Sequence, residues 1–269
     1  MAMTHCYHKG IMRMSEQRDA IKRAAARLRL DVFVRYESLI DRKIPFEDNL
    51  YRLLEEQVRL ADERSFARRI HNAGFPQVKT MDTFVMSEEH LPYVNFDELR
   101  ELGSCAFIEE KNDIVAIGPA GRGKTHIALA IGYEAAKRGY SVRFKLASRM
   151  LNEMAEAKSD KRLEEYIKSL IRCQLLIIDE IGYLNYDPTA ASLLFQVVSN
   201  RYENGSTFYT SNLKFSEWEK FIGDPQLASA MVDRIAHHAI ILNMNGPKGW
   251  RLEHARSKQQ RGAQAGGAT

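Results

Sequence analysis

The distribution of hydrophobic and polar residues changes character near residue 111 of the chain. Beyond that point, five short apolar runs rich in β-branched residues alternate with stretches whose apolar positions repeat at helical spacing. The runs lie at residues 113–118, 141–146, 174–179, 206–211 and 239–243. Strands that are apolar throughout and separated by helices pair in parallel and are covered on both faces. The pattern therefore predicts an α/β fold with a parallel sheet of five strands.

The first part of the chain has a helical pattern instead. Ile21, Ala25 and Leu28 share one face of a first helix, and Pro45 begins a second helix with a leucine-rich face. We expect a flexible leader at 1–14, in which Met14 is an alternative start, a basic helical module at 15–75, a linker and first core helix at 76–110, an α/β core at 111–254, and a basic flexible tail at 255–269.

A glycine-rich loop follows the first strand of the core directly. It consists of Gly118, Pro119, Ala120, Gly121, Arg122, Gly123, Lys124 and Thr125, which match G-x-x-x-x-G-K-[ST]. The glycines let successive backbone N–H groups point at phosphate oxygens, at the positive end of the helix that follows. We expect Lys124 to contact the β- and γ-phosphates of ATP and Thr125 to hold Mg²⁺, with His126 also at the nucleotide. A simple glycine-rich turn explains the glycines but not the Lys-Thr pair.

Two carboxylates, Asp179 and Glu180, end the apolar strand at 174–179. The end of a buried strand is a poor place for charge unless a cation or ligand lies there. About 55 residues after a phosphate loop, the pair is typical of an ATPase, with Asp179 on Mg²⁺ and Glu180 as the base for the attacking water.

Three further polar residues are candidates for the chemistry. Asn212 follows the next strand, which in this type of sheet lies between the two motif strands, so Asn212 is placed to orient the attacking water. Asparagine after a strand is also ordinary turn chemistry. Arg234 and Arg201 are candidates for an arginine finger supplied across a subunit interface, and either can equally be a structural ion-pair partner.

Charge is concentrated at both ends of the chain. Residues 1–29 hold seven Lys or Arg against two acidic residues, and residues 248–269 hold five against one. Such asymmetry favours a polyanionic partner. We assign phosphate contacts with duplex DNA to the basic residues of the first helix, Arg18, Lys22, Arg23, Arg27 and Arg29. The alternative is a solvated helix face, and no sequence-reading signature accompanies these residues.

Composition indicates where the protein is located and which chemistry its cysteines have. The apolar runs are strand-sized and no secretory signal is visible, so we expect a cytoplasmic protein without a membrane partner. Cys6, Cys105 and Cys173 have no metal-ligand spacing, and we expect free thiols.

With these residues in hand, residues 80–252 resemble the IstB-type insertion-sequence helper ATPases, relatives of the DnaC-type helicase loaders in the AAA+ class. The resemblance includes Gly182-Tyr-Leu184 after the acidic pair and Asp233-Arg-Ile-Ala-His-His238. It implies an AAA+ three-layer fold, ATP hydrolysis at subunit interfaces and binding of duplex DNA. It also implies a homo-oligomer, either a ring or a helical filament, because the 26 residues after Asn243 are too few for the usual helical lid.

The family's functional residues carry over to matching positions. Lys124 and Thr125 resemble the phosphate and Mg²⁺ ligands, and Asp179 and Glu180 the metal carboxylate and catalytic base. Asn212 resembles the first sensor and Arg234 the finger. Arg251 resembles the second sensor, although its segment departs from the family's Gly-x-Ser-Tyr-Arg pattern by one residue.

Two functions remain open on the sequence. The first is a regulator that recruits and activates the transposase encoded by the same element, and the second is a loader of a replicative helicase. A GTPase is disfavoured because the chain lacks an Asn-Lys-x-Asp segment, and Pro119 stands where partition-type ATPases have a lysine.

Overall fold

The computed structural model describes residues 14–85 and 87–246. They form two compact units, one ending at Ala67 and the other beginning at Arg68, so that the long helix α3 (Phe46–Ala73) belongs to both. Within these described ranges, no helix is both long and apolar enough to cross a membrane.

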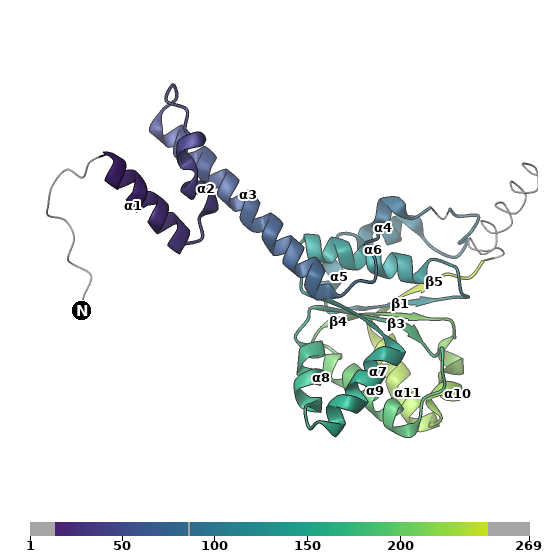
Figure 1. Cartoon of the computed structure of the whole chain (residues 1–269). Helices are drawn as coiled ribbons and strands as arrows, with labels where there is room; N and C mark the ends of the chain where they lie inside the picture. The colour runs from purple at the N-terminus through teal and green to yellow at the C-terminus, as the bar shows by residue number, and fades with distance from the viewer. Residues whose placement is uncertain (1–13, 86, 247–269) are drawn as a thin grey trace, which may run out of the picture. The chain divides into compact units, whose positions relative to one another are not determined.

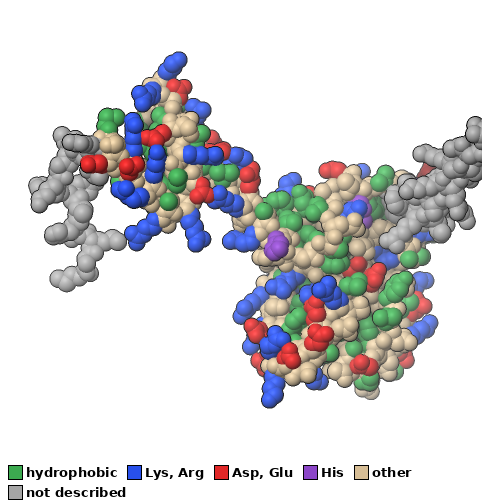
Figure 2. Space-filling view, in the orientation of Figure 1, with side chains coloured by type: hydrophobic (Ala, Val, Ile, Leu, Met, Phe, Trp, Pro, Cys, Tyr) green, Lys and Arg blue, Asp and Glu red, His purple; other side chains and the backbone are tan. Residues whose placement is uncertain are grey.

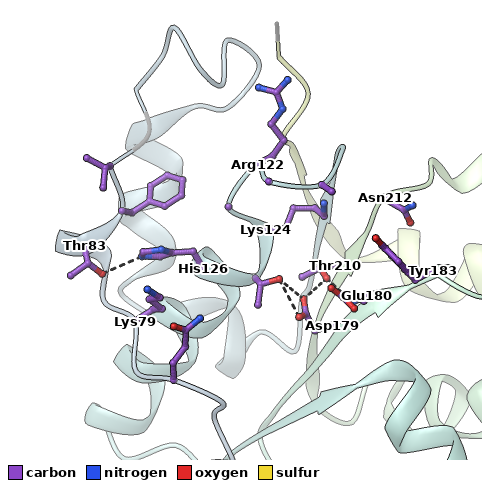
Figure 3. A pocket seen from close by; sticks show the side chains of 17 residues that line it. Lys79, Thr83, Arg122, Lys124, His126, Asp179, Glu180, Tyr183, Thr210 and Asn212 are labelled. Atoms are coloured by element: carbon purple, nitrogen blue, oxygen red, sulfur yellow. Dashed lines mark hydrogen bonds between the residues drawn. The ribbon is translucent and has the colours of Figure 1, made fainter. Parts of the chain in front are cut away.

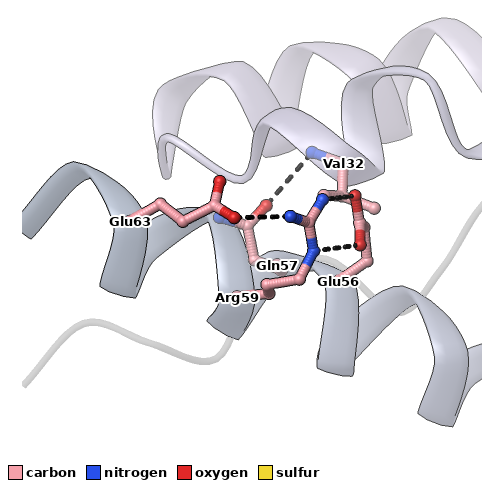
Figure 4. A network of polar contacts seen from close by, with 5 residues as sticks. All are labelled: Val32, Glu56, Gln57, Arg59 and Glu63. Carbon is pink, nitrogen blue, oxygen red and sulfur yellow. Dashed lines mark hydrogen bonds and ion pairs between the residues drawn. The ribbon is translucent and has the colours of Figure 1, made fainter. Parts of the chain in front are cut away.

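The first unit is entirely helical among the residues described. It contains α1 (Met14–Arg27), α2 (Asp31–Val34), the 3₁₀ turn η1 (Tyr36–Ser38) and the start of α3. The backbone N–H of Val32 donates to Gln57 Oε1 at 3.1 Å, which fixes α2 against α3. Figure 4 shows this contact beside an exposed network in which Arg59 binds Glu56 and Glu63. The predicted pair of helices is present, joined by a short third one.

The second unit is a three-layer α/β structure (Figure 1). Its sheet contains β1 (Asp113–Ile117), β2 (Val142–Leu146), β3 (Leu175–Ile181), β4 (Ser206–Ser211) and β5 (Ala239–Asn243), all parallel, in the order β2-β3-β4-β1-β5. The predicted fold class is confirmed, and β4 lies between β1 and β3 as expected.

Helices cover both faces of this sheet. One face carries η2 (Met81–Thr83), α4 (Phe96–Leu102), α5 (Ala106–Glu109) and α6 (Lys124–Lys137). The other carries α7 (Ala147–Ser159), α8 (Leu163–Ile171), α9 (Pro188–Arg201), η3 (Phe215–Glu217), α10 (Trp218–Ile222) and α11 (Pro225–His237). A hydrophobic cluster lies on this second face, where residues of β1, β3 and β4 pack against α7 to α11.

The starts of α9 and α11 show why the sequence folds this way locally. Asp187 accepts a hydrogen bond from the backbone N–H of Ala190, and Asp224 caps α11 in the same way. A proline follows each cap at the first helical position, where a missing N–H costs nothing. These caps fix where the helices begin, and so where the loops at the carboxyl edge of the sheet must lie.

Candidate nucleotide site

The phosphate loop lies between β1 and α6, as the sequence predicts. Gly121 and Gly123 have φ of 79° and 82°, a conformation that disfavours side chains. A Cβ on Gly118 would lie 2.6 Å from the carbonyl oxygen of Met244, so only glycine fits there. The Lys124 ammonium donates to the carbonyls of Gly118 (2.6 Å) and Pro119 (2.9 Å). The backbone of these glycines shapes the loop, and the side chain of Lys124 folds back over it.

Asp179 occupies the centre of the polar edge next to the loop. Only 3% of its surface is exposed, and its carboxylate accepts hydrogen bonds from the hydroxyls of Thr125 (3.0 Å) and Thr210 (2.6 Å). Thr210 in turn accepts a hydrogen bond of 2.9 Å from the backbone N–H of Glu180. Both residues expected at the metal, Thr125 and Asp179, are therefore in direct contact.

A backbone irregularity places Glu180 at the same pocket as Asp179. Consecutive residues of a regular strand point to opposite faces of the sheet. Here the register between β3 and β4 shifts between Ile178 and Ile181, and Glu180 has φ of 63°, in the left-handed region. The bulge lets both carboxylates line one pocket, and Glu180 is exposed in it. A strained non-glycine residue at this point is typical of a functional site.

These residues line a pocket of about 390 Å³ (Figure 3). The structure brings together the loop residues 120–125, His126, Asp179, Glu180 and Asn212, all of which the sequence had indicated. The pocket has seven further lining residues that the sequence analysis did not identify, namely Gln77, Lys79, Thr83, Phe84, Val85, Tyr183 and Thr210. Tyr183 lay inside the motif at 182–184 and Thr210 inside the predicted strand at 206–211, whereas residues 77–85 lie 33 to 41 positions before the loop and carry no signal of their own.

His126 joins the phosphate loop to this earlier segment. Its Nε2 lies 3.2 Å from both Thr83 Oγ1 and the carbonyl oxygen of Thr80, and its ring meets Phe84 edge-on at 5.3 Å. Burial lowers the pKa of His126 below its usual value, so the imidazole is neutral at pH 7. One side of the pocket therefore holds the rings of Phe84 and His126 together with the ammonium of Lys79, while the other carries the phosphate loop and the carboxylates.

Arg122 lies in the phosphate loop but turns its guanidinium away from the acidic pair (Figure 3). The side chain is 6% exposed and donates to the carbonyl oxygens of His90 and Gly246. It ties the loop to the segment that leaves β5. Only the backbone of Arg122 is available to phosphate in this arrangement.

The structure separates the two finger candidates. Arg201 is 2% exposed and donates to the carbonyl oxygens of Leu170, Cys173 and Ser206. The interpretation of Arg201 as a finger is wrong, because its buried guanidinium donates hydrogen bonds that join the start of β4 to the end of α8. Arg234 is partly exposed on α11, donates to the carbonyl of Ala230 (2.9 Å) and lies over the ring of Phe195.

Arg234 is not among the residues that line the pocket of its own chain, and Arg251 lies outside the described residues. If Arg234 acts on a nucleotide, it does so from another subunit.

The basic residues assigned to DNA differ in their surroundings. Arg18 and Lys22 pair with Glu37 at 3.1 and 2.6 Å, whereas Arg23 and Arg27 are exposed on α1. Arg29 is also exposed, but the expectation that it lies on the first helix is wrong, because α1 ends at Arg27 and Arg29 has φ of 58°. Figure 2 shows Lys and Arg side chains over much of one face of the first, helical unit, with acidic side chains among them.

The sheet order, the phosphate loop after β1, the acidic pair at the end of β3 and the polar end of β4 define a phosphate-loop nucleotide-binding protein of the AAA+ class. The chain belongs to the family of IstB-like ATP-binding proteins, whose family model matches residues 25–258. The resemblance seen in the sequence is confirmed.

Two curated relatives belong to insertion sequences. The chain is 39% identical over 218 residues to an IS5376 protein of Geobacillus stearothermophilus, covering 81% of this chain and 86% of the relative. It is 34% identical over 224 residues to an IS21 protein of Pseudomonas aeruginosa, covering 82% and 83%. Both relatives carry the name of ATP-binding proteins.

Among solved structures, the fold is similar to DnaI, with a TM-score of 0.52 at 19% identity over 62% of this chain and 90% of that one. It is also similar to AMPPCP-bound DnaA from Aquifex aeolicus, with a TM-score of 0.52 at 20% identity over 68% of this chain and 55% of that one. At these identities the likeness shows a shared fold.

Proposed function

We propose that this chain is an ATP-hydrolysing regulator of transposition. It binds duplex DNA with little sequence preference, assembles on the target, and recruits and activates the transposase encoded by the same element. The observation that carries the proposal is the convergence of the phosphate loop, the Thr125–Asp179 contact and Glu180 in one pocket. The core at 111–254 performs the ATP chemistry, and the helical module at 15–75 contacts DNA.

The polar side of the pocket fits an Mg²⁺–triphosphate. Thr125 and Asp179 offer a hydroxyl and a carboxylate, the hard oxygen ligands that Mg²⁺ prefers, and these would hold the ion. Bound Mg²⁺ offsets the negative charge of the β- and γ-phosphates. Lys124 exchanges its two loop carbonyls for phosphate oxygens. On the aromatic side, Phe84 and neutral His126 offer a surface for the adenine ring.

Two residues at the open end of the pocket act on the attacking water. Glu180, exposed and facing the pocket, accepts the proton of the water that attacks the γ-phosphate. Asn212, at the end of β4, orients that water with its side-chain amide. Thr210 holds the backbone of Glu180 and the carboxylate of Asp179 together, and so keeps the base and the metal ligand in register.

Arg234 completes the site of a neighbouring subunit. A guanidinium stabilises the charge that develops on the γ-phosphate in the transition state. The phosphate loop has two basic side chains, and because Arg122 is turned away, only Lys124 is directed toward the phosphates. Because the nucleotide then contacts two subunits, ATP promotes assembly into a ring or filament.

Sedimentation of the protein with duplex DNA and either ATP or ADP tests the assembly. Glu180→Gln binds ATP without cleaving it, so this variant forms large complexes with ATP and DNA that persist. The double variant Glu180→Gln/Arg234→Ala sediments as the small species. A Glu180→Gln protein that remains monomeric with ATP and DNA contradicts the assembly.

DNA binding rests on Arg23, Arg27 and Arg29, the exposed members of the basic set. A plot of the logarithm of the DNA-binding constant against the logarithm of the salt concentration has a negative slope, and each lost phosphate contact reduces its steepness by about one unit. Replacing these three by Ala therefore flattens the salt dependence without changing sequence preference. Arg59→Ala is the matched control, since Glu56 and Glu63 already neutralise that side chain. If the triple variant has the same salt dependence as the wild type, DNA binds at residues other than these three.

The partner is a transposase because the chain's relatives are proteins of insertion sequences. Co-purification of tagged protein with the transposase of its own element tests this directly. Retention of a replicative helicase and not of the transposase would instead support a helicase loader.

A further inference from the structure

Two sequence segments that the proposed function does not use meet at one place in the structure. Glu203 follows the end of α9, His237 is the last residue of α11, the helix that packs against α9, and His238 follows it directly. One nitrogen of each imidazole and one carboxylate oxygen of Glu203 all lie within 4.8 Å of one another. All three side chains are exposed, so a solvent ion reaches them without any opening of the core.

Tyr202 orients the two imidazoles. Its hydroxyl lies 2.8 Å from His237 Nδ1, and its ring stacks on that of His238 at 6.4 Å with 27° between the planes. Histidines that bind metal ions commonly use the nitrogen opposite to one fixed by a hydrogen bond. The contact with Tyr202 leaves His237 Nε2 as the nitrogen for an ion.

The backbone of each segment is anchored independently. On one side, Arg201 is buried, and its carbonyl accepts hydrogen bonds from the backbone N–H groups of Asn204 (2.9 Å) and Gly205 (3.0 Å), around a left-handed Glu203 with φ of 59°. On the other side, the carbonyl of His238 accepts a hydrogen bond of 3.0 Å from the N–H of Asp113 in β1. Anchored backbones hold the three side chains near one another at lower entropic cost.

This cluster is separate from the nucleotide site. Glu203 and His238 precede β4 and β5, which begin at Ser206 and Ala239. The nucleotide pocket lies where β3 and β4 end, at Asp179 and Asn212. In a parallel sheet those are opposite edges, so an ion at the cluster does not compete with the Mg²⁺ expected beside ATP.

We propose that Glu203, His237 and His238 form a binding site for a divalent transition metal of the Zn²⁺ type. Two imidazoles and one carboxylate are a ligand set that tetrahedral Zn²⁺ accepts, with the fourth position open to water or to a ligand from another molecule. Glu203 gives the ligand set one negative charge, and Asp233 and Arg234, one turn earlier on α11, contribute opposite charges nearby. The ion would tie the end of α9 to the helix that carries Arg234.

Titration with Zn²⁺ alone, in competition with a chromophoric chelator, tests the site. The measurement uses the full chain with His5→Ala, Cys6→Ser and His8→Ala, so that no imidazole or thiol near the N-terminus competes for Zn²⁺. This background binds about one Zn²⁺ per chain at the cluster. Adding His237→Ala, His238→Ala or Glu203→Gln weakens binding at least about tenfold, whereas the exposed controls His71→Ala and Glu219→Gln leave it unchanged.

Tyr202→Phe provides a second test that retains all three ligands. It removes only the hydroxyl, which contacts His237 and also hydrogen-bonds to Glu203, and weakens Zn²⁺ binding by about ten- to a hundredfold. Zn²⁺ also raises the melting temperature of the background protein and leaves that of the His238→Ala protein unchanged. The proposal is overturned if the background protein binds no stoichiometric Zn²⁺, or if the three ligand variants bind it as tightly as the controls.

Discussion

The hydroxyl of Thr210 donates a 2.6 Å hydrogen bond to Asp179 Oδ1, which links β4 to β3 directly beside the phosphate loop. The same hydroxyl accepts a hydrogen bond from the backbone N–H of Glu180. One buried threonine therefore positions both acidic residues of the site, and its loss affects the fold and the chemistry together.

Thr210→Val preserves the shape of the side chain and removes both hydrogen bonds. Because Asp179 is buried, we expect a loss of about 1–3 kcal/mol in the stability of the second unit and a lower rate of ATP hydrolysis. Thr210→Ser keeps the hydroxyl and is the control. Thermal melting and phosphate release measure the two effects, and a Val variant that matches the Ser variant in both would contradict this role.

Arg201→Leu tests whether that arginine is structural. Its guanidinium donates to at least three buried carbonyls, which the leucine leaves without a partner, so the melting temperature falls, with a cost of about 3 kcal/mol or more. Protein that remains folded at low temperature binds ATP as before, since Arg201 does not line the pocket. An Arg201→Leu variant that keeps normal stability but no longer hydrolyses ATP would contradict the structural role and support Arg201 as the finger.

Arg234→Ala has the opposite signature. The side chain is partly exposed, so the melting temperature and the affinity of a single chain for ATP change little, while hydrolysis in the presence of DNA falls by about 10³-fold because neighbouring subunits no longer share the nucleotide. Mixing separates action within a chain from action between chains. Arg234→Ala protein retains a phosphate loop and Lys124→Ala protein retains a finger, so the mixture regains activity that neither has alone. An inactive mixture argues against a finger supplied between subunits.

The buried thiols give a prediction about reactivity. Cys105 and Cys173 are 0% and 5% exposed, and burial raises the pKa of Cys105 to about 11. The raised pKa means that the thiolate appears only toward pH 11, so the neutral thiol persists at pH 8. Iodoacetamide at pH 8 leaves both residues unmodified in the native chain and modifies them in urea, as mass spectrometry will show. Rapid modification of native Cys105 would contradict its burial.

Much of the core could be predicted because its signals are local. The five strands were found to within two residues at each end. The inner strands β1, β3 and β4 are buried over most of their length and therefore need apolar, β-branched or aromatic residues, whereas β2 and β5 at the ends of the sheet order are only partly buried. The phosphate loop was equally visible, because close approach of backbone to phosphate demands glycine at fixed positions.

The missing parts of the site depend on contacts between distant segments. Nothing in residues 77–85 indicates that Thr80, Thr83 and Phe84 meet His126, since that contact exists only after α6 has packed. The bulge at Glu180 follows from pairing with β4, and the burial of Arg201 from the carbonyls around it. The residue type alone does not distinguish an arginine buried in a core from one that acts at an interface, so the sequence left Arg201 and Arg234 as alternatives.

The central claim is that Glu180 activates water for attack on ATP held by the phosphate loop. The most direct measurement is phosphate release by wild-type and Glu180→Gln protein with ATP, Mg²⁺ and duplex DNA, alongside the affinity of each for ATP. We expect the wild type to release phosphate, and the variant to lose at least about 10²-fold in rate while binding ATP within about twofold of the wild type. A wild-type protein that never cleaves ATP, or a variant that cleaves it equally fast, would contradict the account.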